Sequence, residues 1–147
     1  MNREPEPGTL NQNRELGTGN LIRPLHLWGP VLIQMTVIFI ASSISDVPPL
    51  PGGMSDTSGH SIGYAILGAL LLRALAGGRM RGVTWRTALA TVVLATLYGV
   101  SDEFHQSFVP NRTPDVYDVL ADATGATAAT TAGVALATLR ASSARSR

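Results

Sequence analysis

The stretch Ser101–Asp122 is the most informative part of this chain. It reads SDEFHQSFVPNRTPDVYDVLAD, it lies between two apolar segments, and its charged residues continue into the ends of both. An ionisable residue at or inside a membrane span is costly, and by default it marks a functional site. The stretch therefore predicts a functional site at the ends of apolar helices. The apolar segments of the chain have to supply these helices.

The composition favours a membrane protein of one domain. Charged residues make up only 14% of the 147 residues, against roughly 25% in soluble domains. Polar ends hide how apolar the middle is, because the mean hydropathy of the whole chain is only +0.19. The net charge of +1 gives no field for a nucleic-acid partner. The absence of cysteine excludes disulfides and thiolate chemistry.

Four apolar segments predict an all-α, polytopic membrane protein with four transmembrane helices in a bundle. The first segment is about long enough to cross the roughly 30 Å hydrocarbon layer. It is too long for the apolar part of a signal peptide, so we expect it to be retained as a span. The second segment is short for a span. In order, the segments are residues 25–44, 59–75, 83–100 and 116–139.

The two ends of the chain differ from this apolar middle. Residues 1–24 are rich in Pro, Gly, Asn and Glu and contain few apolar side chains. Such a segment cannot bury enough surface to offset its ordering entropy, so we expect a disordered tail. Residues 25–139 are expected to form the membrane domain, and residues 140–147 a short basic tail.

The distribution of arginine predicts the orientation in the membrane. Ten of the eleven Arg lie in the two tails and in the loop 73–86, and Arg112 stands alone between the third and fourth segments. Basic residues are retained on the cytoplasmic side. We therefore expect a multi-pass protein of the cytoplasmic membrane, embedded in the lipid bilayer. Both termini would be cytoplasmic, and residues 45–58 and 102–115 would face outward.

Polar residues recur at helical spacing near the outward ends of three segments. Residues three or four apart share one face of a helix. Because these three ends lie at the same membrane surface, we expect their polar residues to meet in one binding site, called the polar cluster below. The polar cluster comprises Asp56, His60, Tyr64, Asp102, Glu103, Gln106, Arg112, Asp118 and Asp122.

The acidic residues of this region have different expected roles. Arg112 is the one fixed cation among several carboxylates, and we predict that it pairs with Glu103 or Asp118. Asp115 is expected to cap the fourth helix, because a carboxylate there accepts from free backbone N–H groups. Asp122 lies deeper in the same helix, where capping explains less, so we predict a partner within the polar cluster.

Small residues at four-residue spacing predict close helix packing. Ala121, Gly125, Ala129 and Gly133 follow one face of the fourth segment. Small residues let helix backbones approach each other in a membrane. We expect this stripe to face the other helices, although Ala and Gly are also abundant in this chain generally.

These motifs resemble those of the VanZ-like membrane proteins, a family named for an accessory teicoplanin-resistance protein. The resemblance covers about residues 30–139, and its most specific part is the pattern Glu-x-x-Gln…Pro-x-Arg…Asp that begins at Glu103. The chain departs from the family at Thr57, often Lys, at Asn111, often Gly, and at Asp122, usually Asn. The resemblance implies a membrane protein of the cell envelope with a role in antibiotic resistance, and it implies no reaction.

Three functions remain open from the sequence. In the first, the polar cluster recognises an envelope component, such as a lipid-linked precursor, or a glycopeptide antibiotic. Alternatively, the protein is an enzyme on a lipid-linked substrate, with His60 or Glu103 as general base and Arg112 on an anionic group. In a third reading, the cluster only closes the helix bundle through interhelical hydrogen bonds.

The sequence assigns no metal and no cofactor. Several residues of the polar cluster region are of the right type to bind a divalent ion. Their spacing matches no metal motif, and pairing with Arg112 explains their charges equally well. The residues of suitable type are His60, Glu103, His105, Asp118 and Asp122.

Overall fold

Four α-helices form the structure, a computed structural model that describes residues 7–46, 51–53 and 55–146. No strand occurs within these ranges, so the predicted all-α class is confirmed. Two connections also contain a short 3-10 turn. The elements are α1 (Pro7–Ser42), η1 (Pro51–Gly53), α2 (Asp56–Leu75), η2 (Met80–Gly82), α3 (Trp85–Gln106) and α4 (Val116–Arg145).

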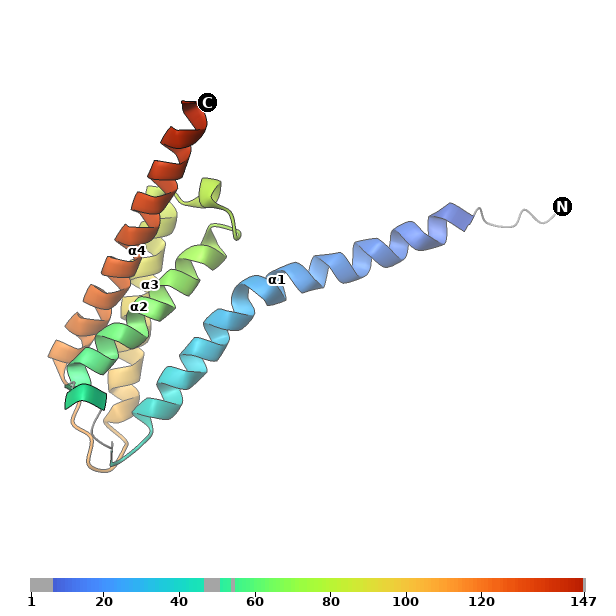
Figure 1. Ribbon diagram of the computed structural model, residues 1–147. Helices are drawn as coiled ribbons and strands as arrows, with labels where there is room; N and C mark the ends of the chain where they lie inside the picture. The colour runs from blue at the N-terminus through green and yellow to red at the C-terminus, as the bar shows by residue number, and fades with distance from the viewer. Residues whose placement is uncertain (1–6, 47–50, 54, 147) are drawn as a thin grey trace.

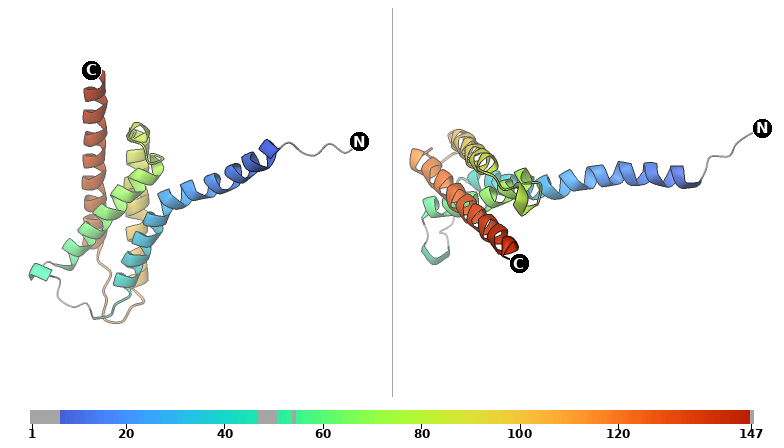
Figure 2. Two further views of the ribbon diagram at one scale, coloured as in Figure 1. Left: turned by 45° about the vertical axis from the view of Figure 1, so that its right-hand side comes forward. Right: turned by 90° about the horizontal axis from the view of Figure 1, so that it is seen from above.

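Helices α2, α3 and α4 pack with the second half of α1 into one bundle (Figures 1 and 2). The largest interface joins α2 to α4; α4 also packs on α3, and α1 lies mainly against α2. The α1–α2 and α3–α4 connections lie at one end of the bundle, which we call the site end (Figure 1). The α2–α3 connection and the C-terminus lie at the opposite end. The starts of α2 and α4 therefore lie beside the end of α3, as the polar stripes predict, and the end of α1 lies at the same end of the bundle.

Helix α1 is longer than the apolar segment predicts. It begins at Pro7, so residues 7–24 are helical and the predicted disordered tail is wrong over this range. The prediction compared the ordering entropy only with the burial of apolar surface. Once the apolar segment has nucleated a helix, however, each further helical residue costs little free energy. Residues 1–6 of the predicted tail lie outside the described residues.

The first half of α1 leaves the bundle, and the helix changes direction near its middle (Figure 1). Pro24 and Pro30 both lie inside the helix. Proline removes a backbone hydrogen bond and is a usual cause of such a bend. At the other terminus, α4 continues to Arg145 and so includes most of the predicted basic tail.

Glycine allows α2 and α4 to approach each other closely. A Cβ atom added at Gly68 would lie 2.9 Å from the Cα of Ala126, and one at Gly125 would overlap the backbone carbonyl of Ser61. A Cβ atom at Gly133 would lie 2.5 Å from a leucine side chain of α2. The predicted small-residue stripe of α4 therefore faces α2 at Gly125 and Gly133.

Several hydrogen bonds attach α1 to the other helices, and two of them lie near the middle of its apolar segment. The Gln34 amide donates to the carbonyl of Gly63 at 3.1 Å, and the Tyr98 hydroxyl donates to the carbonyl of Met35 at 2.7 Å. The apolar core consists of aliphatic side chains and the ring of Tyr64. Its buried members are Val31, Ile38, Tyr64, Leu67, Leu71, Ala74, Ala95 and Ala126.

Local side-chain chemistry explains where α3 and α4 begin. Thr84 and Thr87 form a capping box at the start of α3. The Asp115 carboxylate accepts from the N–H of Tyr117 at 2.8 Å, which confirms its predicted role as the cap of α4. In the connection before it, Asn111 has a φ of 63°. Asparagine tolerates this left-handed conformation better than most residues do.

Filling the space at Gly125 should destabilise the bundle. The added methyl group in Gly125→Ala would meet the Ser61 carbonyl, so the free energy of unfolding in detergent should fall by about 1–3 kcal/mol. Gly29→Ala is the matched control, because no atom lies within 4 Å of the added carbon. If both variants unfold at the same denaturant concentration, the proposed close contact of α2 and α4 is wrong.

Candidate functional site

Polar side chains from all four helices meet at the site end. Asp102, Glu103 and Gln106 on α3 are buried, and Asp122 on α4 has no exposed surface. Ser42, at the end of α1, is also buried there. Buried polar groups normally have hydrogen-bond partners, so the contacts of these residues indicate how the site is built.

An imidazole–carboxylate pair joins α2 to α4. His60 Nδ1 lies 3.1 Å from Asp122 Oδ1, and Asp122 is completely buried while His60 keeps 11% of its side chain exposed. A glycine makes room for this carboxylate, because a Cβ atom at Gly99 would lie 2.5 Å from Asp122 Oδ2. The predicted partner of Asp122 within the polar cluster is therefore His60.

The carboxylates of α3 are held by hydrogen bonds from three directions. Ser42 donates to Asp102 Oδ2 at 2.7 Å, which ties the end of α1 to α3. The Gln106 amide donates to Glu103 Oε1 at 3.0 Å and to Asp102 Oδ2 at 3.4 Å. The backbone N–H of Asp115 donates to Glu103 Oε2 at 2.8 Å. Both carboxylates are thus fixed in orientation, and Glu103 also anchors the α3–α4 connection.

Several oxygens of the polar cluster have no hydrogen-bond partner among the described residues. They include one oxygen each of Asp102, Asp118 and Asp122, and the hydroxyl of Tyr64. Tyr64 is buried one turn below His60, and its ring lies between those of His60 and Tyr98, with centroids 6.5 and 6.1 Å away. An unpartnered buried polar group costs about 1–3 kcal/mol, so these atoms mark where the cluster lacks donors or positive charge.

Arg112 pairs with a different carboxylate from those predicted. Its Nη1 atom donates to Asp56 Oδ2 at 2.7 Å, and neither Glu103 nor Asp118 forms an ion pair with it. Its Nε donates to the carbonyl of Ile44 at 3.1 Å and its Nη2 to that of Ala41 at 3.4 Å. The guanidinium of Arg112 therefore attaches the α3–α4 connection to the end of α1 and the start of α2. Glu103 is not its partner, and both oxygens of Glu103 already accept hydrogen bonds from other groups.

The site has more negative than positive charge. Asp102, Glu103 and Asp122 are buried together, and the only ionisable base that contacts them among the described residues is His60. The guanidinium of Arg112 is occupied by Asp56 and by two carbonyls. The cluster consequently presents acceptors, and it needs donors or positive charge from elsewhere.

His105 lies outside this arrangement, although the sequence includes it among the suitable metal ligands. Its ring stacks on Phe39 with centroids 4.4 Å apart, and its Nε2 lies 3.0 Å from Ser43 Oγ. Ser43 Oγ also donates its one proton to the carbonyl of Phe39 at 2.6 Å. The imidazole must then donate to the hydroxyl, so this pair does not have the arrangement of a nucleophile and its base.

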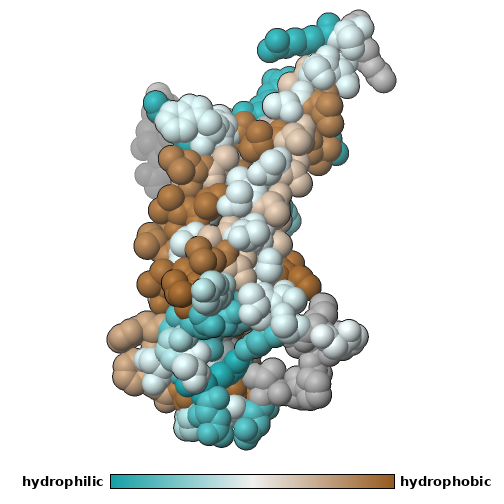
Figure 3. All heavy atoms as spheres, turned by 90° about the vertical axis from the view of Figure 1, so that its left-hand side faces the viewer, coloured by the Kyte–Doolittle hydropathy of each residue, from teal (hydrophilic) through white to brown (hydrophobic). Residues whose placement is uncertain are grey.

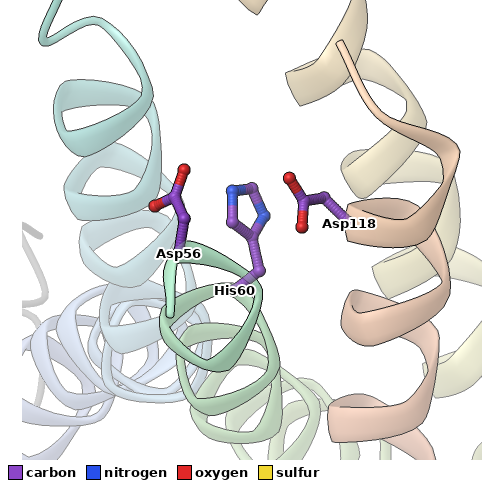
Figure 4. A group of neighbouring side chains, drawn as sticks. All are labelled: Asp56, His60 and Asp118. Carbon is purple, nitrogen blue, oxygen red and sulfur yellow. The ribbon is translucent and has the colours of Figure 1, made fainter. Parts of the chain in front are cut away.

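Two overlapping sets of side chains have the donor types of a metal site. Asp56, His60 and Asp118 form the outer set, and His60, Asp102 and Glu103 form the inner set. In each set, one donor atom per residue lies within 4.8 Å of the other two. Figure 4 shows the outer set, with the His60 ring between the carboxylates of Asp56 on α2 and Asp118 on α4.

Sequence reasoning did not identify the contribution of α1 to this site. Ser42 reaches Asp102, and Ser43 reaches His105. The available signal was the serine pair at the end of an otherwise apolar segment. Helical spacing alone carried no information about it, because these serines belong to a different helix from the residues they contact.

Comparison with known proteins gives one family. The sequence model of the family described as VanZ/LLP1 matches residues 11–138, a range that contains the whole polar cluster. No curated protein and no solved structure matches the chain significantly.

The three contacts of Arg112 predict that lysine cannot replace it. Lysine keeps the charge but has no planar fork to reach Asp56 and both carbonyls together. Arg112→Lys should therefore increase hydrogen exchange across residues 107–115 almost as much as Arg112→Gln does. Arg86→Lys, at the opposite end of the bundle, is the control. Wild-type exchange in Arg112→Lys would show that charge alone is sufficient.

Proposed function

The chain belongs to the VanZ/LLP1 family, and from its structure we propose a role in recognition at the cell envelope. In this proposal the chain crosses the cytoplasmic membrane four times with both termini inside. The polar cluster faces outward and binds an envelope component or a glycopeptide antibiotic, with a role in antibiotic resistance. The observation that carries the proposal is the set of unpartnered carboxylate oxygens at the site end.

The apolar outer surface supports membrane insertion. Two stretches are long and apolar enough to cross a membrane, Ile22–Ser42 and Asp56–Leu75. Large apolar side chains are also exposed on α3 and α4, and an apolar surface covers much of the face in Figure 3. Exposed apolar surface of this extent is typical of contact with lipid or a partner. Examples are Leu32, Ile33, Ile66, Val93, Leu97, Leu120 and Leu136.

The arginine distribution supports the orientation. Residues 73–86 and the end of α4 lie at the same end of the bundle and carry six of the nine arginines in the described ranges. Arg112 lies alone at the site end. Since basic residues are retained in the cytoplasm, the site end faces outward in this proposal.

The chemistry of the polar cluster favours a ligand with donor groups. Arg112 is occupied, so the described residues of the site end offer no other fixed cation to a bare phosphate or carboxylate. The unpartnered oxygen of Asp118 can accept a hydrogen bond, and Asp56 is half exposed at the rim. A glycopeptide carries amide and sugar hydroxyl donors by its chemical class. An envelope component with amines or hydroxyls meets the same requirement.

Catalysis on a lipid-linked substrate is the second proposal, favoured by the His60–Asp122 pair. A carboxylate that holds one imidazole nitrogen leaves the other available as a general base. Glu103 is less suited to this role than the sequence suggests, because both of its oxygens already accept hydrogen bonds. A purely structural role is disfavoured, since a cluster that only closed the bundle would be more stable without unpartnered carboxylate oxygens.

Topology can be tested with fused reporters. A reporter that is active only outside the cell should be silent when fused after Leu139 and active when inserted in the 107–114 connection. The expected pattern follows from the retention of basic segments inside. An active external reporter after Leu139 would overturn the proposed orientation.

Ligand binding can be tested with teicoplanin and the protein in lipid nanodiscs. Asp118→Asn should weaken binding by about tenfold or more, because a hydrogen bond to a charged group contributes about 1.5–3 kcal/mol. Asp46→Asn, an exposed change at the same end, is the control. Lipid mass spectrometry of the same preparation tests for an envelope component. If neither ligand is retained by the wild type, recognition at this site is refuted.

A further inference from the structure

We propose that the inner set, His60, Asp102 and Glu103, binds one divalent transition-metal ion. One imidazole and two carboxylates suit ions such as Zn²⁺ and Mn²⁺, which accept both nitrogen and oxygen ligands. The inference goes beyond envelope recognition, since it holds whether or not the polar cluster binds an envelope molecule.

The orientation of His60 is the first observation. Its Nδ1 atom faces the buried carboxylate of Asp122 at 3.1 Å, and its Nε2 atom has no hydrogen-bond partner among the described residues. Metal-binding histidines usually have their second nitrogen held by a carboxylate or carbonyl, which sets the tautomer and the ring orientation. Asp122 provides this support from α4, the neighbouring helix.

Both carboxylates of the inner set are supported in the same way. Ser42 and Gln106 donate to Asp102 Oδ2. Gln106 and the backbone N–H of Asp115 donate to the two oxygens of Glu103. All three ligands are thus held by outer hydrogen bonds, as is typical of a built metal site and untypical of an accidental acidic cluster.

Unpartnered buried atoms are the second, independent observation. Asp102 is only 3% exposed, and its Oδ1 atom has no partner among the described residues. Asp122 Oδ2 and the Tyr64 hydroxyl are also buried without a hydrogen-bond partner among the described residues. Burying charges costs several kcal/mol each unless opposite charge offsets them. A dication offsets the charges of Asp102 and Glu103, and it takes the free oxygen as a ligand.

The separation of the donor atoms suits one ion after a small adjustment. The three atoms lie within 4.8 Å of one another. Ligands bound tetrahedrally to one ion at about 2.0–2.2 Å lie about 3.3–3.6 Å apart. Side-chain rotations that bring the donor atoms closer by up to about an ångström therefore close the site, and the ion then joins the start of α2 to the end of α3.

The outer set competes for the same histidine, so one ion occupies one set. Asp56 is half exposed and already pairs with Arg112 at 2.7 Å. Asp118 is only partly buried. The inner set is more shielded from water than the outer set, and hydrogen bonds orient its ligands. The two carboxylates of the outer set stay available to an envelope ligand.

The test is a titration of the full chain in nanodiscs with Zn²⁺ or Mn²⁺ alone, after removal of bound metal with a chelator. Wild-type protein should bind one ion per chain in a saturable manner. Asp102→Asn, Glu103→Gln and His60→Gln should each weaken binding by more than about tenfold, and Ser42→Ala by about tenfold, the usual loss for an outer partner. Asp118→Asn is the matched control and should bind the ion like the wild type.

Absence of saturable binding in the wild type overturns the inference, and so does loss of binding in Asp118→Asn with wild-type binding in Asp102→Asn. X-ray absorption of the metal-loaded wild type needs no variant, so it tests the site even if a variant misfolds. The bound ion should have one imidazole ligand and otherwise oxygen ligands. Any other ligand set refutes the site. Asp118→Asn also separates the two proposals, because it should lose teicoplanin and keep the metal.

Discussion

The burial of carboxylates at the site end is the constraint on which the rest of the structure depends. A buried charge costs several kcal/mol unless another group compensates it. Each buried carboxylate obtains that compensation from a different part of the chain: Asp102 from Ser42 of α1, Asp122 from His60 of α2, and Glu103 from the backbone at Asp115. The relative positions of the helices at this end follow from these three contacts.

Close helix packing makes these contacts possible. Aspartate and serine have short side chains, so their backbones must approach closely before the polar atoms meet. Gly99 admits the Asp122 carboxylate beside α3, and Gly125 brings α4 onto the backbone of α2 at Ser61. The glycines and the polar cluster are therefore parts of one arrangement, and a side chain at either glycine would move Asp122 away from His60.

The sequence predicted the elements of this arrangement better than their pairing. Helical spacing identified the polar stripes of α2, α3 and α4 because spacing within a helix follows from backbone geometry. The partner of Arg112 depends on how three separate segments fold toward each other, and the prediction of Glu103 or Asp118 was wrong for that reason. The helical start of α1 was missed because composition reports burial and carries no information about extension of an existing helix.

The carboxylate at position 122 gives this cluster a property that an amide would not. The VanZ-like family usually has asparagine at this position. An amide side chain can either donate a hydrogen bond to an imidazole or accept one from it. An ionised Asp122 only accepts, so the Nδ1 atom of His60 has to carry a proton, and in the neutral imidazole Nε2 then presents its lone pair. That lone pair is what both a metal ion and a substrate proton require. The negative charge of Asp122 therefore fixes the orientation of the His60 ring. Because Asp122 is completely buried, water does not compete with His60 for its carboxylate.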